Sequence, residues 1–470
     1  MLRVRLAVAC IAGFSASLIL NYPGFMNDDS VRQVLEARSG VYSNWHPPIM
    51  AFTWHLIEKI VPGPFGMLVF QTALIWSGTF LVSVYWFKNS NPSVLAFSPC
   101  LLIFFPPIFG ITGALWKDVF MLGFLILAIG IAGGIKGWSG YRNLAMLLFG
   151  SVFSFAAMLF RYNGLFAVVP LIALGVVQAT GEAGGGRQLV RASIIGVIVF
   201  STMLVGVKVV NDALTTVDDP IWVAPALFDI AGVIHGTADA ERQIALYQQV
   251  PSNFRLDKSS LDNLLHYYSP KRWESLIHAS HPAFVYQHLT EMDKQNLIRA
   301  WYSSVVSHPL AWFSHRMRVF RYNVAFNSDV TVPIYMYPHG ISVELLRAYG
   351  TRNPDLNRLQ RFVDSILTGM SQLVLFKPWI YLIICISVII TCVKFSVPKK
   401  REIALITGSG LTHALGVFLF APAPDYRYSH YTVYVGTLGL ILLLRAILLT
   451  EQRIISRGTR LKIITSPARI

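Results

Sequence analysis

Residues 65–87 read FGMLVFQTALIWSGTFLVSVYWF, a stretch without a single charged side chain. A helix needs about 20 mostly apolar residues to cross the hydrocarbon core of a bilayer. Nine further stretches have this character: 4–21, 93–111, 117–135, 144–161, 164–180, 192–209, 372–394, 403–420 and 431–449. The sequence therefore predicts an all-α polytopic membrane protein with about ten transmembrane helices.

The composition agrees with a chain that folds in lipid. Of its 470 residues, 54% are hydrophobic and only 13% are charged, whereas soluble domains carry roughly 25% charged residues. The net charge of +15 comes from Lys and Arg in short clusters between the apolar runs. This distribution favours contact with the anionic lipid of an inner leaflet over nucleic acid, whose binding proteins gather cations on one hydrated face.

The connecting segments predict an orientation. If both termini are cytoplasmic, the basic connections all fall on the cytoplasmic side, as the positive-inside rule requires. These connections contain Lys88, Lys136 with Arg142, Arg187 with Arg191, residues 399–401, and the cations of the C-terminal tail. The segment 4–20 is then a retained first helix and not a signal peptide, because no small-residue cleavage site follows it.

The remaining connections are expected to face outward, and one of them is long enough for a small domain. We divide the chain into an N-terminal membrane module of about seven helices (1–209), an extracytoplasmic region (210–371), and a C-terminal membrane module of about three helices with a basic cytoplasmic tail (372–470). Leu356, Leu359, Val363 and Ile366 recur at helical spacing, which predicts an amphipathic helix. We expect the rest of 210–371 to be mainly helical as well.

The first outward connection, 22–64, carries two adjacent carboxylates, Asp28 and Asp29. A carboxylate held just outside a spanning helix suits a general base, provided that it is positioned and partly desolvated. The simpler alternative is that one of them caps the helix that begins near Ser30; both roles are compatible. Tyr42, Trp45 and His46 follow in the same connection, before two prolines.

Three short outward connections contain cations where the positive-inside rule predicts few. They are Lys117-Asp118, Arg161-Tyr162-Asn163 and Asp425-Tyr426-Arg427-Tyr428. Each cation alone can snorkel or pair with a neighbouring acid. Charges at a membrane boundary are costly and usually functional, and three cations around one outer cavity suit a phosphate or pyrophosphate headgroup.

These four outward features together resemble the C-type membrane glycosyltransferases, polytopic enzymes that use sugars linked to a lipid phosphate. The resemblance implies that Asp28 or Asp29 removes the acceptor proton or binds the acceptor, and that Lys117, Arg161 and Arg427 contact the donor phosphate. Asn27-Asp28-Asp29 departs from the Asp-x-Asp pattern of metal-dependent members, so we expect neither a metal ion nor a cofactor. The further residues expected to bind substrate are Tyr42, Trp45, His46, Asp118, Asn163, Asp425, Tyr426 and Tyr428.

The resulting hypothesis is inverting transfer of a sugar from a polyprenyl-phosphate donor to a surface glycan or lipid-linked acceptor, at the outer face of a bacterial plasma membrane. Two other classes stay open at this point. A flippase or transporter for a lipid-linked sugar favours charges near mid-bilayer and interrupted helices. An acyltransferase or ligase on the outer face needs a catalytic His with a nearby acid, for which His46 and His55 are available.

Overall fold

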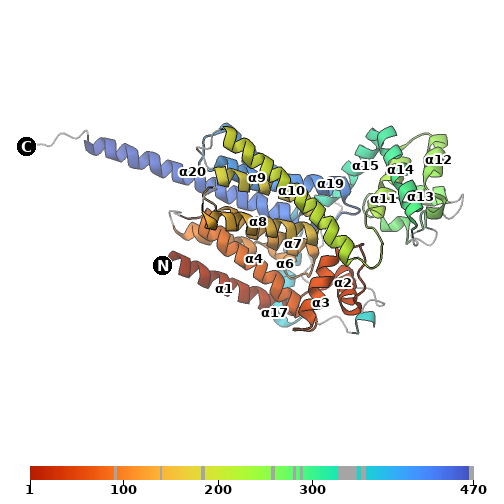
Figure 1. Ribbon diagram of the computed structural model, residues 1–470, viewed down its shortest axis with the longest axis horizontal. Helices are drawn as coiled ribbons and strands as arrows, with labels where there is room; N and C mark the ends of the chain where they lie inside the picture. The colour runs from red at the N-terminus through yellow and green to blue at the C-terminus, as the bar shows by residue number, and fades with distance from the viewer. Residues whose placement is uncertain are drawn as a thin grey trace, which may run out of the picture.

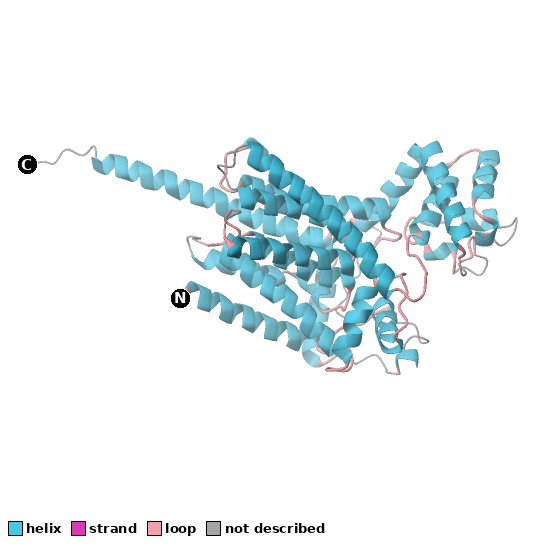
Figure 2. Cartoon of the chain, in the orientation of Figure 1, coloured by secondary structure: helices cyan, strands magenta, loops and turns pink. Residues whose placement is uncertain are grey.

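The structure is a computed structural model that describes residues 1–88, 93–137, 140–180, 186–255, 260–278, 282–285, 289–326, 347–350 and 356–464. The regular structure of these residues is helical (Figure 2), and extended pairing among them is limited to two isolated bridges, Phe25 with Ala114 and Ser43 with Val217. Parts of the expected extracytoplasmic region, including 327–346 and 351–355, and the end of the basic tail at 465–470 lie outside the described residues.

The chain runs through its helices in this order. The first half contains α1 (Leu2–Asn21), α2 (Asp28–Ser39), α3 (Pro48–Glu58), α4 (Phe65–Trp86), η1 (Ser93–Phe97), α5 (Ser98–Ile103), α6 (Pro106–Thr112), α7 (Lys117–Ala132), α8 (Tyr141–Phe160), α9 (Gly164–Thr180) and α10 (Gly186–Leu214). The second half contains α11 (Val223–Gly236), α12 (Ala240–Gln249), η2 (Ser252–Phe254), α13 (Ser260–Tyr267), η3 (Glu274–Leu276), α14 (Glu291–Ser307), α15 (Pro309–Asn323), α17 (Arg358–Met370), η4 (Val374–Phe376), α18 (Trp379–Lys394), α19 (Lys400–Phe420), η5 (Tyr426–Ser429) and α20 (His430–Ile464).

The long helices form one bundle. Figure 1 shows both chain termini at one end of this bundle and the short helices α2 and α3, together with α11–α15, at the other. We call these the terminal end and the domain end. Within the bundle α4 packs along α7, α7 along α8, and α19 along α9, α18 and α20. Gly78 of α4 allows the closest of these approaches, since a Cβ there would lie 2.8 Å from the backbone nitrogen of Leu127 in α7.

Six helices among the described residues are long and apolar enough to cross a membrane, or seven if the bent pair η1–α5 and α6 counts as one span. The six are α1, α4, α8, α10, α19 and the segment Tyr426–Glu451. Of the other expected spans, 164–180 and 372–394 coincide with the shorter apolar helices α9 and α18, and 117–135 coincides with α7. The chain is thus a helical membrane protein, while the number of ten spans stays a prediction.

The surface of the bundle supports a lipid environment. Val197, Val205 and Val209 of α10 are each more than half exposed, as are Val4 and Ile11 of α1. Soluble monomers rarely leave contiguous apolar patches of this kind uncovered. The bend of 51° between α5 and α6 follows from Pro106 and Pro107, which cannot continue the hydrogen-bond ladder of a preceding helix.

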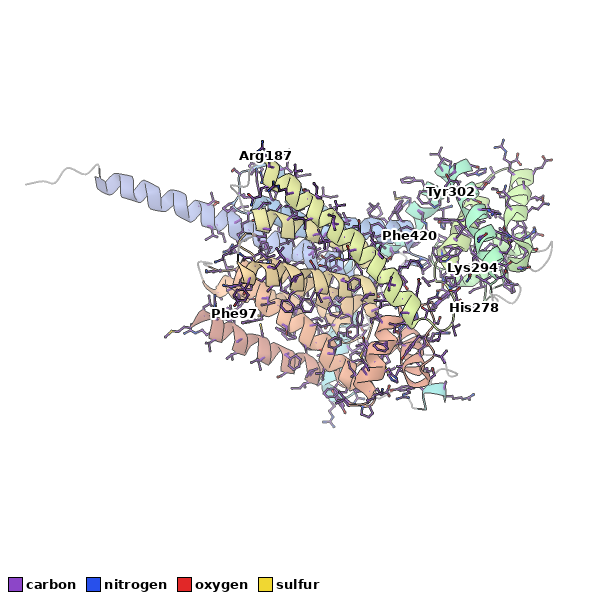
Figure 3. All side chains as sticks on the ribbon, in the orientation of Figure 1. Phe97, Arg187, His278, Lys294, Tyr302 and Phe420 are labelled. Atoms are coloured by element: carbon purple, nitrogen blue, oxygen red, sulfur yellow. The ribbon has the colours of Figure 1, made fainter. Side chains whose placement is uncertain are left out.

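Helices α11–α15 form a small domain with its own apolar core. This core includes Phe228, Phe254, Phe284 and Leu297, all of them almost fully buried. The domain meets the bundle at the domain end, where Figure 3 labels Phe420, the last residue of α19, at the junction. The expectation of helical structure in this part of the chain is confirmed for the residues that the structure describes.

Candidate functional site

The first turn of α2 is capped by Asn27. Its side-chain oxygen accepts from the backbone N–H of Ser30 at 3.1 Å, and the hydroxyl of Ser30 donates to the carbonyl of Leu115 at 2.8 Å. The alternative that Asp28 or Asp29 caps this helix is therefore wrong. Because the cap comes from Asn27, both carboxylates lie in the first turn of α2 without capping it.

The segment before α7 is held against the segment before α2. Phe25 donates its backbone N–H to Gly113 at 2.9 Å, and Leu115 donates to the carbonyl of Phe25 at 2.8 Å. The next residues along the chain are Trp116 and Lys117. This pairing of two extended segments fixes the start of α7 beside the start of α2.

Asp29 lies at the centre of a cluster of charged side chains at the domain end. Arg427 donates to its Oδ2 at 2.6 Å, and the Nε2 atom of His46 lies 3.5 Å from its Oδ1. Lys117 hydrogen-bonds the other ring nitrogen of His46, Nδ1. With Lys117 as the donor to Nδ1, the imidazole carries its proton on Nε2, which faces Asp29.

Burial and the neighbouring Lys117 lower the pKa of His46 to about 4, although Asp29 acts in the opposite direction. The imidazole is therefore neutral near pH 7. Burial by itself raises the pKa of Asp29, but the charge of Arg427 and the contacts with His46 and Lys117 outweigh it and hold the pKa well below its usual range. Asp29 is an anion at every physiological pH.

Arg161 and Asp118 form a second ion pair, with Nε 3.1 Å from Oδ1. The guanidinium of Arg161 also stacks on the ring of Tyr428, 4.9 Å from its centroid. The guanidinium of Arg427 lies 5.4 Å from the same ring, so Tyr428 contacts both cations. The two ion pairs therefore belong to one continuous site, to which Trp116 contributes a ring 4.9 Å from Arg427.

Two of the three cations of this site are paired with carboxylates. Arg427 binds Asp425 at 2.8 Å in addition to Asp29, and Arg161 binds Asp118. The sequence suggested that all three cations are open to an anion. Of these three, only Lys117 has no carboxylate within ion-pair distance among the described residues. Any anionic ligand must compete with these carboxylates, and most directly with Asp29.

Exposure distinguishes the members of the cluster. The side chain of Asp29 is 26% exposed, against 13% for Arg427, 5% for His46 and 2% for Asp118. Asp29 is thus the most exposed of these ion-paired side chains. Asp425, at 16%, is intermediate.

Other residues expected in the site have structural partners. The hydroxyl of Tyr426 donates to the carbonyl of Pro107 at 2.9 Å inside the bundle, and the carbonyl of Asn163 accepts from Phe166 in the first turn of α9. Trp45 packs on Trp273 of the small domain, with centroids 5.9 Å apart. Asp28 lies about 100° around α2 from Asp29, so the two adjacent carboxylates face different directions.

Tyr42 links the first connection to the segment after α10. Its backbone carbonyl accepts from the N–H groups of Thr216 and Val217, and its ring packs edge-on against Phe52 at 6.3 Å. The charge of Glu36 contributes to raising the pKa of its hydroxyl, after the larger effect of burial. Tyr42 therefore borders Glu36 instead of the ion pair of Asp29.

Several groups of the site were missed in the sequence. Gln33 and Glu36 follow Asp29 at helical spacing on α2, a signal available from the spacing alone. The carboxyl of Glu274, in η3 of the small domain, is close enough to Asp29 for the two charges to repel, although burial is the larger cause of its raised pKa. No local pattern distinguishes Glu274 from an ordinary surface acid.

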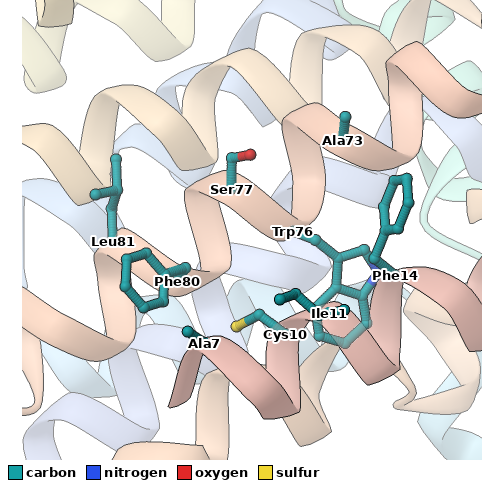
Figure 4. A pocket seen from close by; sticks show the side chains of 9 residues that line it. All are labelled: Ala7, Cys10, Ile11, Phe14, Ala73, Trp76, Ser77, Phe80 and Leu81. Carbon is teal, nitrogen blue, oxygen red and sulfur yellow. The ribbon is translucent and has the colours of Figure 1, made fainter. Parts of the chain in front are cut away.

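An apolar groove of about 450 Å³ lies between α1 and α4. Figure 4 shows the side chains of Cys10, Phe14, Trp76 and Phe80 around it. Its lining is almost entirely apolar, and none of the charged residues of the cluster contributes to it. The groove suits a hydrocarbon chain of the surrounding lipid and is separate from the charged site.

Comparison of the chain with protein families, with curated proteins and with solved structures gives no match. Among the described residues, no group of three or more His, Cys, Asp or Glu side chains is arranged to hold a metal ion. The four cysteines are free and buried. The function must therefore be argued from the geometry of the charged cluster.

Proposed function

We propose that the chain is an integral membrane glycosyltransferase of the C type, which moves a sugar from a polyprenyl-phosphate donor to an acceptor at the membrane face away from the cytoplasm. The ion pair between Asp29 and Arg427 carries this proposal. These residues are 398 positions apart in the sequence, and their contact joins the acidic first connection to the cationic last one. The acceptor is a surface glycan or a lipid-linked glycan.

The cluster has the charges that a lipid-linked sugar phosphate requires. A phosphodiester carries one negative charge, for which the fork of Arg427 and the ammonium of Lys117 are suitable partners. The incoming phosphate competes with Asp29 for Arg427 and binds beside it.

The reaction itself needs few protein groups. The acceptor oxygen attacks the anomeric carbon, its O–H proton passes to a carboxylate of α2, and the carbon–oxygen bond to the phosphate breaks with its electron pair leaving on the phosphate. Such a single displacement inverts the anomeric centre. Cations that neutralise the departing phosphate replace a general acid, because a lipid phosphate is already a good leaving group.

The contacts of His46 favour this reaction over acyl transfer. A catalytic histidine must offer an unprotonated nitrogen to the attacking group. The Nδ1 lone pair of His46 accepts from Lys117, and the protonated Nε2 faces Asp29. His55 donates from Nδ1 to the carbonyl of Ala37 at 2.6 Å, which leaves its Nε2 unprotonated, but among the described residues it makes no ion pair or hydrogen bond with the charged cluster.

Labelled donors test the proposal directly. Membranes that contain the full-length protein are incubated with a panel of polyprenyl-phosphate hexoses and pentoses labelled in the sugar, and in parallel with a labelled acyl donor. We expect release of polyprenyl phosphate together with label in a glycan or lipid acceptor. Label transferred from the acyl donor, with no sugar transferred from any member of the panel, would contradict the proposal.

A further inference from the structure

Asp29 is poorly suited to remove the acceptor proton in the arrangement that the structure shows. Its Oδ2 accepts a charged hydrogen bond from Arg427, and its Oδ1 faces His46. These partners hold its pKa well below the usual range despite its burial. A general base works best when its pKa lies near the operating pH, so a carboxylate this acidic has little tendency to take a proton.

A second carboxylate lies on the same face of α2. With 3.6 residues per turn, Asp29, Gln33 and Glu36 fall within an arc of about 60°, and Glu36 is about 10 Å further along the helix axis. This separation accommodates one sugar ring between a phosphate on Arg427 and a hydroxyl near Glu36. Both carboxylates are within the electrostatic reach of Lys117.

Glu36 has a free oxygen. The backbone N–H of Ser43 stabilises its carboxylate, while the Oε2 atom is buried and has no hydrogen-bond partner among the described residues. A buried carboxylate oxygen without a partner is rare, because leaving it unsatisfied costs about 1–3 kcal/mol or more. An acceptor hydroxyl at this position supplies the missing partner.

Gln33 is a second group without a partner. Its side chain is only 2% exposed, and both the oxygen and the nitrogen of its amide lack a hydrogen-bond partner among the described residues. An amide offers one acceptor and one donor group side by side. This pair matches two neighbouring hydroxyls of a sugar, which can each donate and accept.

We propose that Glu36 accepts the proton of the attacking hydroxyl, that Gln33 holds the acceptor sugar beside it, and that Asp29 serves the cation cluster instead. The inference deepens the proposed glycosyltransferase function and rests on it. The acceptor oxygen forms its bond to the anomeric carbon, the proton goes to Oε2 of Glu36, and the electron pair of the broken bond leaves on the donor phosphate.

The electrostatics of Glu36 agree with this role. Burial raises its pKa to about 7, and Asp219 adds to the rise, while Ser43, Lys117 and Arg32 oppose it. The sign of the pH dependence follows. The protonated carboxyl cannot accept a proton, so the turnover rate falls as the pH decreases through about 7 and levels off above it.

The test compares Glu36→Gln and Glu36→Asp with the wild type in the full-length protein. The rate of polyprenyl phosphate release from a labelled polyprenyl-phosphate sugar is measured against pH, and affinity is measured with polyprenyl phosphate alone. We expect Glu36→Gln to lower kcat by about 100-fold or more, to keep the affinity, and to lose the decline below about pH 7. Glu36→Asp recovers part of kcat and retains the decline.

Three controls separate the alternatives. Glu241→Gln changes an exposed acid of α12 and leaves both measurements as in the wild type. Glu36→Gln with near wild-type kcat and an unchanged pH profile overturns the inference. The inference also fails if Glu274→Gln, and not Glu36→Gln, loses the decline of the rate below about pH 7. A wild type that binds no polyprenyl phosphate and turns over no donor overturns the proposed function, and the inference with it.

Discussion

The pairing of individual side chains is the property that the sequence predicts least. Cations in short outward connections indicated that Lys117, Arg161 and Arg427 belong together, because the positive-inside rule predicts few of them there. The positive-inside rule does not indicate which carboxylates these cations pair with. The contact of Arg427 with Asp29 depends on how helices from opposite ends of the chain pack, and only its helical spacing from Asp29 marks Gln33.

The fork of Arg427 gives the first prediction at this scale. Arg427 contacts Asp29 through Nη1 and Asp425 through Nε, so both edges of a planar guanidinium are used. Arg427→Lys keeps the charge but loses this geometry. We expect the affinity for polyprenyl phosphate to fall about tenfold, which corresponds to about 1.4 kcal/mol. Titration of the purified protein with polyprenyl phosphate measures it.

Arg445 provides the matched control for Arg427. It lies near the middle of α20 (His430–Ile464), where it donates to the carbonyl of Lys88, far along the helix from the charged cluster. Arg445→Lys should leave the affinity for polyprenyl phosphate unchanged. Equal losses in both variants would mean that the effect reflects general charge or stability, and the assignment of Arg427 to the phosphate would be wrong.

At the scale of elements, the apolar runs predicted helices well and their ends less well. The expected span 93–111 is divided because Pro106 and Pro107 start a new helix after a bend. The start of α2 was misjudged because Asn27, Asp28 and Asp29 are all good capping residues, and only the backbone geometry decides among them. The amphipathic pattern near 356–367 was confirmed as α17, with Gln360 bonded to the carbonyls of Leu20 and Tyr22.

Helix α15 of the small domain holds the connection that carries Arg427. Asn323 donates to the carbonyl of Ala423 at 3.3 Å and accepts from the N–H of Asp425 at 3.2 Å. Two helical turns earlier on the same helix, Arg316 donates to the carbonyl of Ala421 at 2.9 Å. Arg316 is itself fixed by Asp229 at 2.6 Å, and both side chains are fully buried. The small domain thus positions Arg427 from outside the bundle.

Asn323→Ala tests this positioning role. The variant loses two hydrogen bonds to the backbone of 423–425, each worth about 1 kcal/mol, and leaves every charged side chain of the cluster in place. We expect the affinity for polyprenyl phosphate to fall several-fold while the thermal unfolding midpoint changes little. Gln295→Ala, at an exposed position of α14, is the control. A large drop in the unfolding midpoint with unaltered affinity would assign Asn323 to stability alone.

For the whole molecule, the sequence predicted where polar and apolar parts meet but not how many times the chain crosses the membrane. The pattern of charges in the connections supports ten spans, whereas six helices, or seven with the bent pair, meet a length criterion among the described residues. Both statements are compatible because the helices α7, α9 and α18 are short. All four outward features converge at the domain end, and the two termini lie at the opposite end (Figure 1). Because both termini are then on one side of the membrane, this arrangement agrees with an even number of crossings.

Helix α18 is the decisive case for this topology. Its 16 residues span about 24 Å, less than the roughly 30 Å of a hydrocarbon core. The preceding segment Val374–Phe376 lengthens the apolar path, and a short helix can be accommodated by local thinning of the bilayer at modest cost.

If α18 crosses, Ser365 of α17 and Ser396 after α18 lie on opposite sides of the membrane. In a variant without its four buried native cysteines, Ser365→Cys should react with a membrane-impermeant maleimide in intact cells, and Ser396→Cys only after permeabilisation. Both serines are exposed, so equal labelling from outside would show that α18 does not cross. Arg427 would then lie on the opposite side of the membrane from Asp29.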